Sequence, residues 1–261
     1  MGKIIAICNQ KGGVGKTTTA INLAANFAAL EKKTLLIDMD PQGNASQGLG
    51  YLESQEEDIH EALKLAESPD SITKDSLQKF ILKTELDYLK VITAGPDLSA
   101  MELELVNAMS REHRLRRITN VLKEDFDYII IDAPPSLNLL TLNVLTAADS
   151  VLIPVQCEYY ALQGLAELFN TIRLIQKNLN SSLNIEGALL TMYDARLSLS
   201  RQVAEEVRNV IPERVFKIMI PRNVTLSEAP SHGKPVILYY VKSPGSQAYM
   251  KLAEEIINGA K

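Results

Sequence analysis

The chain has little cysteine and no long apolar run. Only two of its 261 residues are cysteines, Cys8 and Cys157, and each lies at the end of an apolar run. Two isolated thiols offer neither a metal-site spacing nor a disulfide framework, so buried free thiols are expected. No apolar stretch approaches the ~20 residues that span a bilayer, and the first residues show no signal-peptide pattern. We therefore expect a cytoplasmic protein without a membrane segment.

The chain also lacks net positive charge. Its formal net charge is −5, which argues against a nucleic-acid partner for the molecule taken as a whole. The charge is unevenly distributed, because residues 196–251 contain nine Lys and Arg but four Glu, a net charge of +5, and the remainder carries −10. This segregation permits a local basic surface on an acidic protein.

Internal repeats and low-complexity tracts are absent too. An apolar content of 46% over 261 residues is sufficient for one large core. We expect residues 1–261 to form a single domain, without an N-terminal helix-turn-helix domain, because an apolar strand begins within the first three residues.

Short apolar runs alternate with longer helical patterns along the chain. Strands are predicted at 3–8, 34–38, 89–93, 128–132, 151–156, 185–191 and 215–220. Helices are predicted near 17–30, 110–123, 138–147, 161–178, 198–210 and 244–258. This alternation predicts an α/β fold with three layers, in which a doubly wound, mostly parallel sheet has helices on both faces. The more polar segment 48–86 is predicted to be an insertion with a helix at 58–66.

The most informative motif follows the first predicted strand. It reads Asn9-Gln10-Lys11-Gly12-Gly13-Val14-Gly15-Lys16-Thr17-Thr18. An ordinary phosphate loop, G-x-x-x-x-G-K-[ST], has glycine where Gln10 stands, and it lacks the second lysine. The three glycines can turn consecutive N–H groups onto phosphate oxygens, and the helix that follows directs its positive end at the same anion. We expect the loop from Lys11 to Thr18 to bind a nucleotide, with Lys16 on the β/γ-phosphates and the Thr17 hydroxyl on Mg²⁺.

Lys11 is the unusual residue of this loop. It lies too early to share the position of Lys16, so its ammonium is expected to point out of its own nucleotide pocket. A cation supplied in trans can stabilise the charge that develops during phosphoryl transfer. Lys11 is therefore a candidate catalytic group across a two-fold nucleotide-sandwich dimer, the alternative being a solvated surface lysine.

Acidic side chains follow two other predicted strands. Asp132 ends the strand at 128–132, where an acid facing the phosphate loop acts as a Walker B group that holds Mg²⁺; the alternative is a helix cap, although Ser136 is expected to cap the next helix. Asp38 and Asp40 follow the strand at 34–38 and could alternatively form a plain acidic turn. Because ligands bind at the carboxyl ends of parallel strands, all three motifs are expected to converge on one crevice.

The loop K-G-G-V-G-K-T-T resembles the deviant Walker A box of the ParA/MinD superfamily of P-loop ATPases. Together with D-M-D-P-Q-G-N, I-I-D-A-P-P-S, V-Q-C-E-Y-Y-A-L-Q-G-L and I-P-R-N-V-T-L-S-E-A-P-S-H-G-K-P, it makes the chain similar to the chromosomal ParA/Soj partition ATPases over essentially its whole length. The resemblance implies a slow Mg²⁺-dependent ATPase that dimerises on binding ATP. It further implies non-specific binding to double-stranded DNA, nucleoid association, and hydrolysis stimulated by a ParB/Spo0J-type centromere-binding protein.

The resemblance also implies roles for individual residues. Asp40 would orient the attacking water, and Asp38 would support the magnesium shell with Thr17 and Asp132. Two further segments resemble the adenine-flanking segments of the superfamily. These segments suggest Met192 and Pro221 against the adenine ring, with Asn223, which follows Arg222, hydrogen-bonded to its edge; a similar set of residues also occurs in ordinary cores.

Non-specific DNA binding requires Lys and Arg side chains directed at phosphates, and dimerisation doubles a weak basic surface. The candidates for such contacts are Arg196, Arg201, Lys234, Lys242 and Lys251, each of which could also be only a solvated charge. Thr225 stands where the family often has an arginine that contacts DNA, which implies that the DNA surface is rearranged or weaker.

Three related classes fit the sequence less well. A MinD-like membrane ATPase needs a basic, bulky amphipathic C-terminal helix, whereas the segment 250–261 carries Glu254 and Glu255. A plasmid-type repressor would carry a helix-turn-helix domain, and a metabolic enzyme of the same fold would need a substrate acid–base set or paired cluster cysteines. The remaining alternative is a cargo-positioning ATPase of the superfamily that does not act through DNA.

Overall fold

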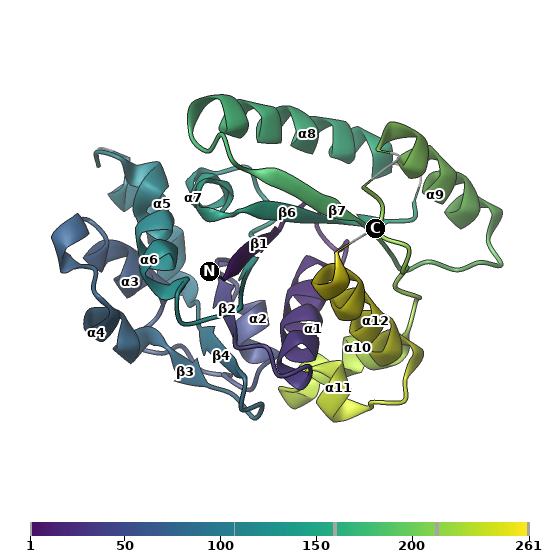
Figure 1. Ribbon diagram of the computed structural model, residues 1–261, viewed down its shortest axis with the longest axis horizontal. Coiled ribbons are helices and arrows are strands. Elements are labelled where there is room, and N and C mark those ends of the chain that lie inside the picture. Colours follow the sequence, from purple (N-terminus) through teal and green to yellow (C-terminus); the bar gives the residue numbers. More distant parts are fainter. Residues whose placement is uncertain (1, 107, 159–160, 212–213, 260–261) are drawn as a thin grey trace.

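The fold is built on one seven-stranded sheet, shown in the computed structural model of the chain (Figure 1). The structure describes residues 2–106, 108–158, 161–211 and 214–259. The strands are β1 (Lys3–Ile7), β2 (Thr34–Asp38), β3 (Leu82–Lys83), β4 (Leu89–Ile92), β5 (Tyr128–Asp132), β6 (Ser150–Gln156) and β7 (Asn184–Thr191). Their order is β3-β4-β2-β5-β1-β6-β7, and every pair is parallel except the short pair β3–β4. The predicted doubly wound, mostly parallel sheet is confirmed.

Helices cover both faces of this sheet. On one face lie α3 (Ile59–Leu65), α4 (Lys74–Leu77), α5 (Met101–Glu104), α6 (Arg114–Leu122), α7 (Leu139–Ala147), α8 (Ala161–Asn178) and α9 (Ser198–Val210). On the other lie α1 (Lys16–Ala29), α2 (Asn44–Gln47), α10 (Val224–Glu228), α11 (Val236–Tyr239) and α12 (Pro244–Asn258). Because side chains alternate along a strand, β1 contributes Ile4 and Ala6 to the first core and Ile5 and Ile7 to the second.

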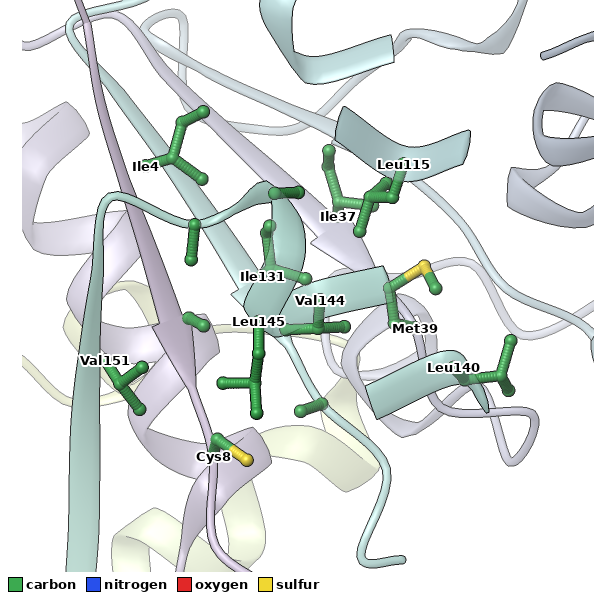
Figure 2. Packing of buried hydrophobic residues seen from close by; sticks show 14 of the residues in the cluster. Ile4, Cys8, Ile37, Met39, Leu115, Ile131, Leu140, Val144, Leu145 and Val151 are labelled. Carbon is green, nitrogen blue, oxygen red and sulfur yellow. The ribbon is translucent and has the colours of Figure 1, made fainter. Parts of the chain in front are cut away.

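The first core is seen from close by in Figure 2. Ile4, Ile37 and Ile131 come from three neighbouring strands and belong to one buried cluster with Val144 and Leu145 of α7. The cap of α7 differs from the sequence prediction, because Asn138, and not Ser136, accepts a hydrogen bond from the amide of Thr141 at 3.2 Å. Both cysteines are buried free thiols, as predicted.

The predicted strand at 215–220 is wrong. This segment runs beside β7, but Val215 forms only an isolated bridge with it. The amides of Lys217 and Ile218 donate instead to the carboxylate of Glu255 on α12, at 2.9 and 3.3 Å. The contact with β7 is therefore discontinuous: the amides of Phe216 and Ile220 still donate to carbonyls of β7, at 3.0 and 2.9 Å, while a side chain from another layer takes two of the donors between them. The short strand β3, which lies in the predicted insertion, was not predicted either.

Within that insertion, the predicted helix at 58–66 is confirmed as α3. Its N-terminus is capped by Asp58, whose carboxylate accepts hydrogen bonds from the amides of His60 and Glu61. Among the described residues, no helix combines the length and apolar character that a bilayer crossing requires.

Candidate functional site

The phosphate-loop motif joins β1 to α1. Gly13 and Gly15 have φ values of +72° and +88°, in the left-handed region that glycine tolerates. The start of the loop is anchored by Asn9, whose Nδ2 donates to the carbonyl of Pro154 at 2.7 Å and whose Oδ1 accepts from the amide of Lys11 at 3.0 Å. The sequence analysis did not identify Asn9, because its role depends on the neighbouring strand β6.

Lys16 begins α1 and turns back into the loop. Lys16 is only 7% exposed, and its Nζ donates to the carbonyl oxygen of Lys11 at 3.3 Å. Burial lowers the pKa of Lys16, while the nearby Asp132 and Asp40 carboxyls oppose that shift. The ammonium is therefore held in a partly desolvated position, where an anion would interact with it strongly.

Two adjoining cavities lie along the carboxyl edge of the sheet. The larger, of about 350 Å³, is lined by Gly12, Gly13, Gly15, Lys16, Thr17, Thr18, Asp40, Gln42, Asn44, Pro135 and Met192. The smaller, of about 140 Å³, is lined by Gly15, Thr18, Thr191, Met192, Ile220, Pro221, Arg222, Asn223, Leu226, Ser227 and Tyr249. Because the two cavities share Gly15, Thr18 and Met192, an elongated ligand can extend from one into the other. The residues predicted for phosphate and for adenine are thus brought together, whereas the side chain of Val14 is buried and lines neither cavity.

Asp38 and Asp132 lie opposite each other in the register of β2 and β5, and both are fully buried. Asp38 is held by Ser46, whose amide and hydroxyl donate to one carboxylate oxygen at 2.9 and 2.8 Å, and by the amide of Asp40 at 3.1 Å. Burial raises the pKa of Asp38 to about 6, although these hydrogen bonds oppose the shift. Ser46 was missed by the sequence analysis, since nothing in the motif indicates that α2 folds back onto Asp38.

Asp132 has a different environment. Within the described ranges, neither of its carboxylate oxygens has a hydrogen-bond partner. Burial, followed by the Asp38 carboxyl, raises the pKa of Asp132 well above its ordinary range, while the Thr17 hydroxyl and the Lys16 ammonium oppose this shift. A buried carboxylate without a partner is costly unless a cation neutralises it.

The residues at this point fit magnesium. Mg²⁺ is usually held by one or two carboxylates together with phosphate oxygens and water, and here two buried carboxyls lie beside the hydroxyl of Thr17. In the part of the chain that the structure describes, no three His, Cys, Asp or Glu side chains form a metal-ligating group. The donor set is therefore incomplete without a ligand that brings its own oxygen atoms.

Asp40 and Lys11 differ in their access to the larger cavity. Asp40 lines it, and its Oδ1 accepts from the amide of Gln42 at 3.0 Å. Lys11 does not line it, and its Nζ lies 3.4 Å from Oε2 of Glu158, in an ion pair where both side chains are partly exposed. The Lys11 side chain thus pairs with Glu158 and is no part of the cavity lining.

Known proteins are similar to this chain in sequence and in fold. A family model described as an AAA domain matches residues 2–185. The chain is 55% identical over 258 residues to the chromosome partitioning protein ParA of Myxococcus xanthus, a match that covers 98% of this chain and 88% of that protein. It is also 55% identical to the sporulation initiation inhibitor protein Soj of Bacillus subtilis, with 98% of both chains covered. The chain belongs to the ParA/Soj family of chromosome-partitioning ATPases. It is an ATPase of that family.

A solved structure similar to this ParA/Soj family member contains bound ligands. Cobyrinic acid a,c-diamide synthase from Mycobacterium smegmatis, with a bound ATP analog and magnesium, is 33% identical and superposes with a TM-score of 0.83 over 99% of this chain and 95% of that one. Nucleotide and Mg²⁺ are therefore the ligands of this fold that the two cavities and the buried carboxyls are suited to hold.

The residues that the sequence analysis predicted to contact adenine lie near the end of β7. Met192 has a φ of +51°, which is uncommon for a residue other than glycine, so the chain turns sharply after Thr191. Tyr193 and Pro221 form an isolated parallel bridge, which places the segment 220–223 against the end of β7. Asn223 is already hydrogen-bonded within its segment, because its Oδ1 accepts from the Thr225 hydroxyl.

The basic residues predicted for DNA contact fall into two groups. Arg196 makes a two-pronged ion pair with Asp194, at 2.9 and 2.7 Å, which holds the pKa of that carboxyl at about 2, and Lys234 lies 3.2 Å from Glu85. Arg201 donates to the carbonyl of Ala195. Lys242 and Lys251 are exposed, and no ion pair involves either of them in the ranges that the structure covers. Arg196 and Arg201 lie just before and within α9, whereas Lys234 precedes α11, Lys242 precedes α12 and Lys251 lies within α12.

Proposed function

We propose that residues 1–261 act as one ATPase domain that switches between a free protomer and a DNA-bound sandwich dimer. The observation that carries this proposal is that the loop and Asp40 line one cavity at the carboxyl edge of the sheet, where the buried Asp38 and Asp132 end β2 and β5 opposite each other. The ParA and Soj names of relatives at 55% identity support chromosome partition as the process that it serves.

In this proposal the loop from Lys11 to Thr18 holds the phosphates, and Lys16 pairs with the β/γ-phosphates. Thr17, Asp38 and Asp132 hold Mg²⁺, which when bound neutralises the charge that develops on the transferred phosphoryl group. Asp40, at the mouth of the same cavity, orients the attacking water. The smaller cavity accepts adenine between Met192 and Pro221, with Arg222 and Asn223 at its rim.

Lys11 supplies the charge that the protomer lacks. Its ammonium leaves the Glu158 ion pair and reaches the phosphates bound by the second subunit, which makes hydrolysis dependent on the dimer. An exposed ion pair contributes only about 0–1 kcal/mol, so the contact with Glu158 does not prevent this exchange. A ParB/Spo0J-type partner stimulates hydrolysis and so ends the dimeric state.

DNA binding is proposed to be non-specific and confined to the ATP dimer, with Arg196, Arg201, Lys234, Lys242 and Lys251 as the phosphate contacts. Of these five side chains in the described part of the chain, Lys242 and Lys251 are exposed and in no ion pair, and dimerisation joins two such surfaces on one duplex. The protein would then be cytoplasmic and associated with the nucleoid, without a membrane partner.

The test is binding to a duplex of arbitrary sequence by fluorescence anisotropy, with ATP, with ADP and without nucleotide, across a salt series. We expect tight binding in ATP alone, with log affinity falling linearly as log salt rises. The double variant K242A/K251A should weaken the binding and flatten the slope, whereas K33A/K90A, which removes two lysines that are not among the proposed contacts, should do neither. Equal affinity in ATP and ADP would contradict the switch.

A further inference from the structure

One buried hydrogen bond joins the wall of the smaller cavity to the phosphate loop. The hydroxyl of Thr191 donates to the carbonyl oxygen of Val14 at 2.8 Å, although the two residues are 177 positions apart. Thr191 is the last residue of β7 and is 2% exposed, and Val14 lies in the middle of the phosphate loop. None of the residue roles proposed above involves this hydrogen bond.

The position of the Thr191 hydroxyl is set by the sheet. Thr191 is in register with Gln156 of β6, and its carbonyl accepts from the amide of Cys157 at 3.3 Å. The chain then leaves the strand through the left-handed conformation of Met192, and the amide of Tyr193 donates to the carbonyl of Ile220. Both sides of Thr191 are therefore fixed by backbone contacts that do not involve the loop.

The middle of the loop, in contrast, consists of residues with much backbone freedom. Val14 is flanked by Gly13 and Gly15, both at positive φ, and glycine is the residue with the most alternative backbone conformations. Asn9 anchors the start of the loop, and the Thr191 hydroxyl is bonded to its middle.

We propose that Thr191 is a positioning residue that holds the phosphate loop in its anion-binding conformation from the wall of the base cavity. This inference rests on the proposed binding of ATP at the loop. Thr191 touches no reacting atom, and it acts by reducing the conformational freedom that the loop would lose when it closes on phosphates. The benefit applies to ligands that carry phosphates and not to the base alone.

The test compares Thr191→Val, which keeps the shape but has no donor, with Thr191→Ser, which keeps the donor. Binding of ATP, ADP and adenosine is measured by isothermal titration calorimetry on the full chain. Because one neutral hydrogen bond is lost, we expect Thr191→Val to weaken the binding of ATP and ADP by about 3- to 10-fold. The affinity for adenosine should change by less than about 2-fold. Thr191→Ser should bind ATP within about 2-fold of the wild type.

Wild-type affinity for ATP in Thr191→Val overturns the inference, as does an equal loss for adenosine, which would mean a damaged base cavity. If Thr191→Val does not fold, Thr191→Cys, a much poorer donor, carries the same comparison. Lys16→Ala separates the two proposals: if it binds ATP as tightly as the wild type, the loop is not the phosphate site and the proposed function fails. If Lys16→Ala loses ATP and Thr191→Val does not, only the role of Thr191 is wrong.

Discussion

Asp132 is the residue at which stability and function are most directly opposed. It is fully buried, lies opposite Asp38, and has no hydrogen-bond partner in the described part of the chain. A buried carboxylate without a partner is costly, so the fold alone should be more stable with a neutral side chain there. The pairing Asp38–Asp132 thus fits the cation site proposed above.

Asp132→Asn should therefore stabilise the nucleotide-free protein. We expect the free energy of unfolding at pH 7.5, measured by urea denaturation without Mg²⁺, to rise by about 1–3 kcal/mol. Added Mg²⁺ and ATP should stabilise the wild type and not the variant.

The difference in the free energy of unfolding between the two proteins should narrow as the pH falls. Burial raises the pKa of Asp38 to about 6 and that of Asp132 well above its ordinary range, so both carboxyls favour the protonated form in the folded state. The stability linked to that protonation is present at low pH and is lost as the pH rises. A nucleotide-free variant that is less stable than the wild type at pH 7.5 would show that Asp132 has a stabilising partner in the apo fold.

Among the elements, the turn after α2 and the segment before α11 approach each other closely at two glycines. Gly50 and Gly233 have φ values of +95° and +64°, and a Cβ atom added to Gly233 would lie 2.9 Å from the Cα atom of Gly50. Asn22 of α1 fixes the same region, because its Oδ1 accepts from the amide of Val236 at 2.8 Å. The helix that follows the phosphate loop and the helix that follows Asp40 are both packed against the C-terminal elements.

Gly233→Ala should disrupt this contact. The new methyl group overlaps backbone that cannot rotate away, and the residue must also adopt a strained φ, so we expect a loss of about 2–4 kcal/mol in the free energy of unfolding. Gly259→Ala is the matched control, because its φ is +68° and a Cβ atom there meets nothing within 4 Å. It should cost about 1 kcal/mol or less. Similar losses in the two variants, measured by urea denaturation, would mean that φ strain alone matters and that the close approach is relieved elsewhere.

At the scale of the whole molecule, the proposed cycle depends on two subunits. Lys11 pairs with Glu158 and does not line its own cavity, so the charge that we propose it supplies would act on a second subunit. The proposed dimer would bring that charge to the phosphates and at the same time double the basic surface. Nucleotide, subunit contact and DNA binding are thereby linked in one equilibrium.

Asp40→Ala should trap the dimer. The variant keeps the loop and the metal-binding residues, so it should bind ATP, but without a group to orient water it should not hydrolyse it. Light scattering after gel filtration should give a dimer with ATP and a monomer with ADP. The double variant K11A/D40A should bind ATP and remain largely monomeric, and a monomeric Asp40→Ala with ATP would contradict the sandwich.

Much of this molecule follows from local sequence. The order of strands and helices, the loop, and the acids at strand ends could be predicted because each depends on residue type and on spacing within a few positions. The segment 215–220 was predicted wrongly. Its apolar residues fit a strand, but Glu255 of a distant helix accepts hydrogen bonds from the amides of Lys217 and Ile218. The partners of Asp38 and Val14, namely Ser46 and Thr191, were missed for the same reason.

The class of fold, the phosphate-binding loop and the family are therefore readable from contiguous motifs. Which side chains support those motifs depends on contacts that form only in the folded chain: Asn9 and Thr191 on the loop, Ser46 on Asp38, and Glu158 on Lys11. A hydrogen bond or an ion pair acts over about 3 Å in space, whatever the separation of its partners along the chain.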